Sequence, residues 1–197
     1  MKRNNRFVIL ILLVLFLSSA SCAEESFSFR NGIHFGMTSE ELIQTEKENE
    51  QVDENEWENF KLGNWIVLGP EERIAVSQYE AYLRYLLADD HMQAAIYLFS
   101  EDTSVPSETE YQYICYALST VYGEADTVLA SEVVTLVDEF ERGGFHESDI
   151  KEAYKWAKTN VVIYQFYYGK EDFIILYSNP NYDYSSFNSR FVNVTGL

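Results

Sequence analysis

Three histidines, His34, His91 and His146, are the residues whose ionisation near neutral pH is easiest to use in chemistry. Each lies near a predicted turn, and none has a partner at the spacing of a known metal-binding motif. His91 follows Asp89 and Asp90, which makes it the best candidate for a weak metal or acid–base site. The interpretation that we favour for His91 is a histidine in a hairpin turn.

Recognisable catalytic motifs are absent from the chain. We find no nucleophile elbow of the form G-x-S-x-G and no phosphate-binding loop. A Ser-His-Asp set stays open, because catalytic triads assemble from distant positions. We predict that the protein is not an enzyme and uses no catalytic residue, cofactor or metal. A hydrolase with a scattered site is an alternative.

Seven acidic residues fall between Glu46 and Glu58. Their spacing differs from that of a calcium-binding EF-hand loop, and the run lacks the glycine that such a loop needs at its turn. We therefore interpret the run as a solvated charged segment rather than as a metal site.

The N-terminus has the pattern of a secretory signal peptide, which we assign to residues 1–21. Lys2, Arg3 and Arg6 precede an apolar run of eleven residues, 7–17, and small residues follow. A run of this length is shorter than the about 20 residues that span a bilayer. Residues 22–28 would form a tether, and residues 29–197 a single α+β domain.

Cys22 ends a stretch that is similar to a bacterial lipobox, whose cysteine is lipidated after cleavage. Ala20 and Ser21 fit this pattern, whereas Ser19 stands where Leu, Val or Ile is usual. The alternative is ordinary cleavage after Ala20. We expect an exported protein, either held at the cell membrane by a lipidated Cys22 or secreted; without lipidation, Cys22 could pair with Cys115 in an oxidising compartment.

The chain is strongly acidic, with 14 basic and 32 acidic residues and a net charge of −18. Removing residues 1–21 takes away three basic residues and no acidic ones, which changes this charge to −21. Such a surface repels nucleic acid and anionic lipid, so we expect no nucleic acid partner and no membrane contact except through Cys22. We expect a protein partner, and a basic protein would be favoured.

The sequence predicts two helices and two β-hairpins. Thr38–Glu48 and Ser107–Tyr122 each begin with a capping box, and the second carries an apolar stripe and ends at Gly123. Alternation predicts one hairpin over 79–87 and 92–99, with 88–91 as its turn, and β-branched and aromatic residues predict a second hairpin over 161–168 and 173–177. An apolar run, 65–68, ends at a strong stop, Gly69-Pro70. Residues 127–157 fit helix or strand, and the tail from Tyr182 to Leu197 fits an extended edge.

This order of elements predicts an α+β fold, with the helices packed on one face of an antiparallel β-sheet. A duplicated α-β-β unit is one arrangement that would produce the order helix, hairpin, helix, hairpin.

The stretch Gly-Met-Thr-Ser-Glu-Glu-Leu at 36–42 resembles the start of a group of small exported bacterial proteins. This group includes the β-lactamase-inhibitor-protein family, the small lipoproteins of outer-membrane assembly and uncharacterised exported proteins. Tyr97-Leu98-Phe99 and Tyr122-Gly123-Glu124 are similar to later motifs of the group, with Ala125 where proline is usual. The resemblance implies helices on one face of an antiparallel sheet and a binding or structural role, and it transfers no catalytic residues.

Fifteen tyrosines suggest where a partner could bind. On the last predicted strand pair, Tyr164 and Tyr168 share a face with Val162 and Phe166, and Tyr167 lies on the other face. Tyrosine suits protein contacts because its ring supplies area and its hydroxyl tolerates water. We therefore name Tyr164 and Tyr168 as candidate partner-binding residues in a non-catalytic secreted or envelope-anchored protein. A structural accessory lipoprotein of a cell-envelope assembly is an alternative.

The lipobox leads to a direct prediction. Two or three acyl chains hold a lipoprotein firmly on a membrane, whereas one chain binds only marginally. Cys22→Ser should therefore move the protein from the membrane fraction to the medium, as measured by immunoblotting of the two fractions. Wild-type protein found in the medium with Ser21 as its first residue would contradict the anchor.

Overall fold

The structure is a computed structural model of the 197-residue chain. It describes residues 27–48, 57–62, 65–76, 79–100, 105–133, 148, 150–168 and 172–184. The predicted signal peptide, Cys22, most of the acidic run, His146 and the tail beyond Tyr184 lie outside the described residues.

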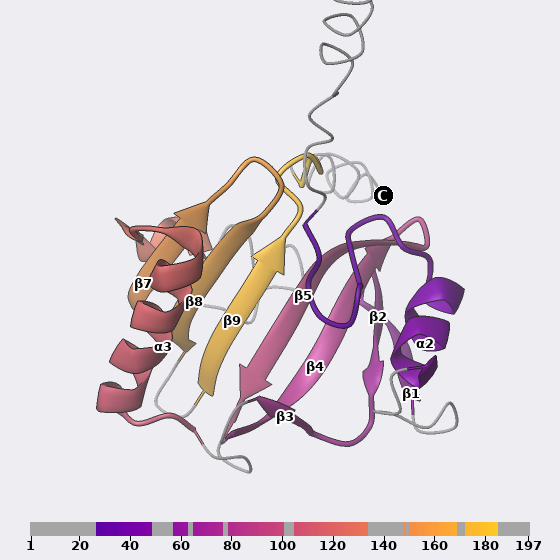
Figure 1. The fold of residues 1–197 in the computed structure, drawn as a ribbon, viewed down its shortest axis with the longest axis horizontal. Helices are drawn as coiled ribbons and strands as arrows, with labels where there is room; N and C mark the ends of the chain where they lie inside the picture. Colours follow the sequence, from indigo (N-terminus) through magenta and orange to yellow (C-terminus); the bar gives the residue numbers. More distant parts are fainter. Residues whose placement is uncertain are drawn as a thin grey trace, which may run out of the picture.

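One antiparallel sheet organises the chain (Figure 1). Its order is β1-β2-β4-β5-β9-β8-β7-β6, and β3 pairs with β4. The strands are β1 (Trp57–Leu62), β2 (Trp65–Pro70), β3 (Ile74–Val76), β4 (Tyr79–Ala88), β5 (His91–Phe99), β6 (Asp126–Val128), β7 (Ile150–Ala157), β8 (Val162–Tyr168) and β9 (Asp172–Ser178).

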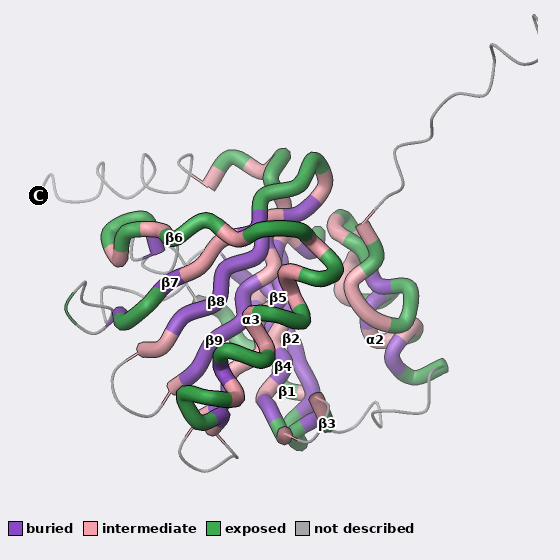
Figure 2. The backbone as a smooth tube through the Cα atoms, turned by 60° about the vertical axis from the view of Figure 1, so that its left-hand side comes forward, coloured by how far each residue is buried: buried purple, intermediate pink, exposed green. Residues whose placement is uncertain are grey.

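The prediction of an α+β fold with helices packed on one face of the sheet was wrong. The described chain is mostly antiparallel sheet, with nine strands against helices α2 (Ser39–Glu48) and α3 (Glu108–Tyr122) and a helical turn at 130–133. The sheet is buried on both faces: Ala94 of β5 belongs to one core cluster and Ala95 to another on the opposite face. In Figure 2 buried backbone runs through the central strands.

The α-β-β unit was also wrong, because each helix is followed by a longer run of strands. α2 precedes β1 to β5, and α3 precedes β6 to β9. The two runs meet through their last strands, where β5 pairs with β9, for example Tyr97 with Ile175. From that seam the strands continue outward in reverse chain order on both sides.

The capped helices and both hairpins were predicted correctly. Thr38 N–H donates to the carboxylate of Glu41 over 2.8 Å, and Glu41 N–H donates to Thr38 Oγ1 over 3.3 Å. At the start of α3, Ser107 N–H donates to Glu110 Oε2 over 2.8 Å, and Gly123 follows the helix with a φ of 83°. These side chains satisfy backbone groups that a helix end leaves open.

Several strands were missed because their sequences lack alternation. β1 begins inside the acidic run, and β3 and β6 have three residues each. The ambiguous end of the 127–157 segment is strand, since β7 covers Ile150–Ala157. Strands of three residues are too short to show a period, and all of these strands depend on their neighbours for hydrogen bonds.

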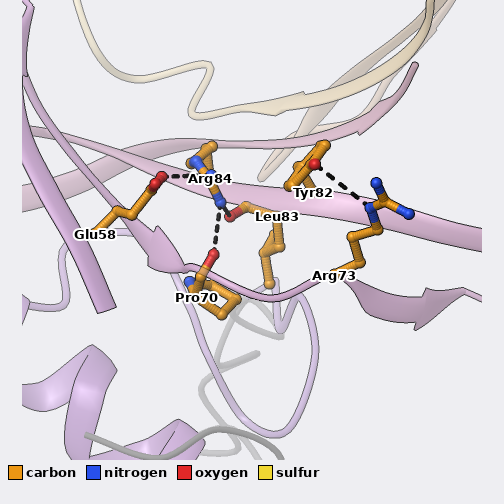
Figure 3. A network of polar contacts seen from close by, with 6 residues as sticks. All are labelled: Glu58, Pro70, Arg73, Tyr82, Leu83 and Arg84. Atoms are coloured by element: carbon orange, nitrogen blue, oxygen red, sulfur yellow. Dashed lines mark hydrogen bonds and ion pairs between the residues drawn. The ribbon is translucent and has the colours of Figure 1, made fainter. Parts of the chain in front are cut away.

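The predicted stop at Gly69-Pro70 is confirmed at Pro70, where β2 ends, but the strand includes Gly69. Arg84 of β4 explains the glycine (Figure 3): its guanidinium donates to the carbonyl oxygens of Pro70 (2.8 Å) and Leu83 (2.9 Å). It also forms an ion pair with Glu58 of β1 over 2.6 Å. A Cβ at position 69 would clash with the carbonyl oxygen of Leu83 and crowd the stem of Arg84. Gly69 therefore allows β4 and its arginine to approach closely.

A buried carboxylate joins the N-terminal arm, residues 27–37, to the sheet. Glu46 of α2 has 1% of its surface exposed. Arg30 Nε lies 3.3 Å from its carboxylate, Asn31 Nδ2 donates to it over 3.4 Å, and the hydroxyl of Tyr85 on β4 also donates to it. Burial of a charge is tolerated only when partners replace the lost water. This cluster thus fixes arm, helix and strand together.

Neither helix that the structure describes has the length and apolar character of a membrane-crossing segment.

Removal of the buried carboxylate should destabilise the protein. Glu46→Ala leaves Arg30 and Tyr85 without their shared acceptor, so we expect the free energy of unfolding to fall by about 3 kcal/mol. Urea unfolding followed by circular dichroism measures this. Glu40→Ala, at an exposed position of the same helix, is the control and should change stability by less than about 0.5 kcal/mol. Equal effects of the two substitutions would contradict the role of Glu46.

Candidate functional site

A groove of about 590 Å³ lies between helix α3 and strands β5 and β9. In Figure 1, α3 lies toward one side of the sheet and the N-terminal arm toward the other, with β9 and β5 between them. Six aromatic side chains contribute to the lining of the groove: Tyr79, Tyr97, Phe99, Tyr113, Tyr122 and Tyr177.

Strand alternation produces the floor of the groove. Tyr97 and Phe99 are two residues apart on β5, and Ile175 and Tyr177 are two apart on β9, so each pair faces the same side of the sheet. Tyr97 pairs directly with Ile175 in the register between these strands. Because β5 and β9 are central in the sheet, the floor is held by hydrogen-bonded neighbours on both sides.

One flank of α3 forms the wall. Glu110, Tyr113, Ala117 and Val121 recur at intervals of three and four residues, which places them along one side of the helix. Tyr113 and Val121 are 70% and 73% exposed, so they form the outer rim. By its spacing Val121 belongs to the apolar stripe of α3, but it faces solvent, whereas Tyr111 on the same stripe is fully buried.

Glu110 supplies the charge of the groove, since none of the other described residues that line it is acidic or basic. Its Oε2 accepts hydrogen bonds from Ser107 N–H over 2.8 Å and from Ser107 Oγ over 2.6 Å. These bonds from Ser107, together with one from Tyr79, lower the pKa of Glu110. The carboxylate is therefore ionised at neutral pH and held at the start of α3, where the helix dipole also favours negative charge.

The groove floor continues into an aromatic cluster under the N-terminal arm. The ring of Tyr177 meets that of Tyr97 edge-on with a centroid distance of 6.2 Å, and that of Phe29 at 4.8 Å. Phe27 stacks on Tyr177 at 6.0 Å. Burial raises the pKa of Tyr97 to about 12 and raises that of Tyr177 as well. Both hydroxyls thus stay protonated, and the floor carries no charge of its own.

The two predicted partner-binding tyrosines lie on the opposite face of the sheet. Tyr164 is 7% exposed, and its hydroxyl donates to Glu132 over 3.2 Å. Tyr168 is half-buried against the same core cluster, as the predicted faces of this strand require. Their role in binding stays a prediction, but burial leaves Tyr164 little surface to offer a partner.

The histidines and the cysteine in the described residues make no composite site. The Nδ1 of exposed His91 lies 2.7 Å from the carbonyl oxygen of Asp89, at the turn where it was predicted, and that of His34 lies 3.0 Å from the carbonyl oxygen of Phe35. Burial raises the pKa of the Cys115 thiol on the inner side of α3. The parts of the chain that the structure describes hold no group of three potential metal ligands.

The groove was not identified from the sequence, although part of its signal was present. Tyr97 and Phe99 alternate visibly on a predicted strand. Glu110 was recognised only as part of a helix-capping box, and Tyr113 was not singled out. What was missing was the pairing of β5 with β9, which unites residues that lie far apart in the chain.

Comparisons of the chain with protein-family models, with curated proteins and with solved structures find no match.

Because the Tyr97 hydroxyl is buried, the free energy of unfolding should fall as the pH rises above 10. In an unfolded chain tyrosine ionises near its ordinary pKa of 10, whereas in the folded protein the pKa of Tyr97 is about 12. The folded state thus keeps a proton that the unfolded state loses. The stability due to this proton is complete below pH 10 and is lost as the pH rises to about 12. Urea unfolding over this pH range measures the loss.

Tyr97→Phe should flatten the decline in stability between pH 10 and 12. Tyr116→Phe, which removes a hydroxyl from a side chain that is 73% exposed, is the control. A decline equally steep in wild type and in Tyr97→Phe would contradict the burial of Tyr97.

Proposed function

We propose that the mature domain is a non-catalytic binding protein that works outside the cytoplasm and holds a segment of another protein in the α3 groove. The observation that carries this proposal is the groove itself: aromatic side chains line a hollow of about 590 Å³ on a paired sheet, next to an exposed apolar rim. Concave, mostly apolar surfaces with a few polar groups are typical of binding sites.

The exposed apolar surface is concentrated at this helix. Among the described residues, five large hydrophobic side chains are exposed, and three of them lie on α3: Tyr113, Tyr116 and Val121. Single exposed apolar residues are ordinary, whereas a group of them beside a hollow is typical of a contact surface. Tyrosine is also enriched among the residues that dominate binding energy at interfaces.

The floor of the groove is rigid, which favours a role in binding over a role in a conformational change of the protein. Tyr97, Phe99 and Ile175 belong to central strands, so little freedom remains for them to lose when a partner binds. Low ordering cost raises affinity for a given contact area. A specific protein interface buries about 800 Å² per partner, so we regard the groove as the centre of a contact surface that extends over α3.

Export is part of this proposal and is supported by the sequence of residues 1–22. The mature protein would be released or held at the membrane by Cys22. In either location it meets proteins of the cell envelope or of the surroundings.

The proposal can be tested by matched substitutions on either side of the groove boundary. Val121, which lines the groove, and Leu129, which does not, are 73% and 76% exposed. Wild-type protein, Val121→Arg and Leu129→Arg should fold equally well, because both positions face solvent. In a pull-down from the host's envelope fraction, we expect the proteins captured by wild type to be lost with Val121→Arg and retained with Leu129→Arg. The same proteins captured by both variants would contradict a binding site in the groove.

A further inference from the structure

We infer that the α3 groove is selective for a basic segment of its partner, in which a lysine or arginine side chain binds Glu110 and a neighbouring apolar side chain contacts Ile114 and Leu118, two half-buried residues of the groove lining. This inference rests on the proposed function and adds the chemical class of the partner.

The charge of the groove favours a basic partner segment. Glu110 is the one charged residue among the described side chains that line the groove. Helix α3 carries no basic residue, and the whole chain has a net charge of −18. A basic segment is therefore attracted both from a distance and at the site, whereas an acidic segment is repelled at both ranges.

The tyrosine rings beside Glu110 also favour a basic side chain. Tyr79 lines the groove and donates a hydrogen bond to Glu110, and Tyr113 lies three residues further along the same side of α3. The face of a tyrosine ring attracts cations, so rings and carboxylate favour the same kind of side chain.

The protein holds its own arginines by the same chemistry (Figure 3). The guanidinium carbon of Arg84 lies 5.4 Å from the ring centroid of Tyr82, and its Nη2 lies 2.6 Å from the carboxylate of Glu58. Arg73 also lies over this ring, at 5.4 Å. A tyrosine ring and a glutamate thus contribute to holding Arg84, together with the carbonyl oxygens of Pro70 and Leu83. In the groove, the tyrosines and the glutamate come from this chain, and the cation would come from the partner.

The apolar part of the groove explains why charge alone should be insufficient. Ile114 and Leu118 line the groove, are half-buried and offer no hydrogen-bonding side-chain groups, so they favour an aliphatic or aromatic side chain next to the basic one. Glu110 is also fixed in place, because its bonds to Ser107 at the helix start restrict its rotamer. A fixed charge beside these apolar side chains selects for the spacing between the two partner groups.

The experiment uses the mature domain and a phage-displayed library of random peptides of about 12 residues. Peptides are selected on wild-type protein and counter-selected on Val121→Arg, so that those retained depend on the groove. We expect the retained peptides to carry lysine or arginine beside an aliphatic or aromatic residue. For these peptides Glu110→Gln should weaken binding by about two- to fivefold, the range of an exposed ion pair with a cation–π contribution.

The matched control is Glu108→Gln, which removes the same charge from the same helical turn at a residue outside the groove lining. Glutamine at position 110 still serves in a capping box, so folding should be preserved. We expect Glu108→Gln to leave the dissociation constant within error of wild type when measured at physiological salt.

The outcomes distinguish a failure of the preference for a basic segment from a failure of the binding function. Groove-dependent peptides that are neutral or acidic, or whose binding is unchanged by Glu110→Gln, would overturn the preference for a basic segment and leave the binding function in place. A failure to recover any peptide that distinguishes wild type from Val121→Arg would overturn both the proposed function and this inference.

Discussion

The contacts of the buried Glu46 carboxylate are the interactions on which the packing of the N-terminal arm and α2 against the sheet depends. It lies at the end of α2 and accepts bonds from the arm and from Tyr85 in the sheet. A carboxyl group with 1% exposure is tolerated only if all of these partners are present together. The cluster therefore specifies one position for the N-terminal arm, which has no strand pairing to hold it along most of its length.

The position of the arm has consequences for the groove. Residues immediately before Arg30, namely Phe27 and Phe29, pack on Tyr177 and Tyr97 from the arm side. These same tyrosines line the groove on the side of α3. The Glu46 cluster thus supports the floor of the proposed binding surface without touching it.

The groove lies at the seam between the two halves of the sheet. One half supplies β5 with Tyr97 and Phe99, and the other supplies α3 and β9 with Ile175 and Tyr177. Neither half alone contains the groove, so the proposed binding requires the β5–β9 pairing. This dependence gives a physical reason for a single sheet across the chain: a partner would contact a surface that exists only when both halves are folded.

The sequence by itself determined the local elements whose signals are short-ranged. Capping boxes at Thr38 and Ser107 and the alternation of Tyr97 with Phe99 predicted helices and strands at the correct places, because these signals depend on neighbouring residues. The tertiary structure alone decided the fold class and the candidate site. Strands such as β1 and β6 form because a partner strand satisfies their backbone groups, and the groove forms because β9 lies beside β5. Both are long-range pairings, which no local periodicity encodes.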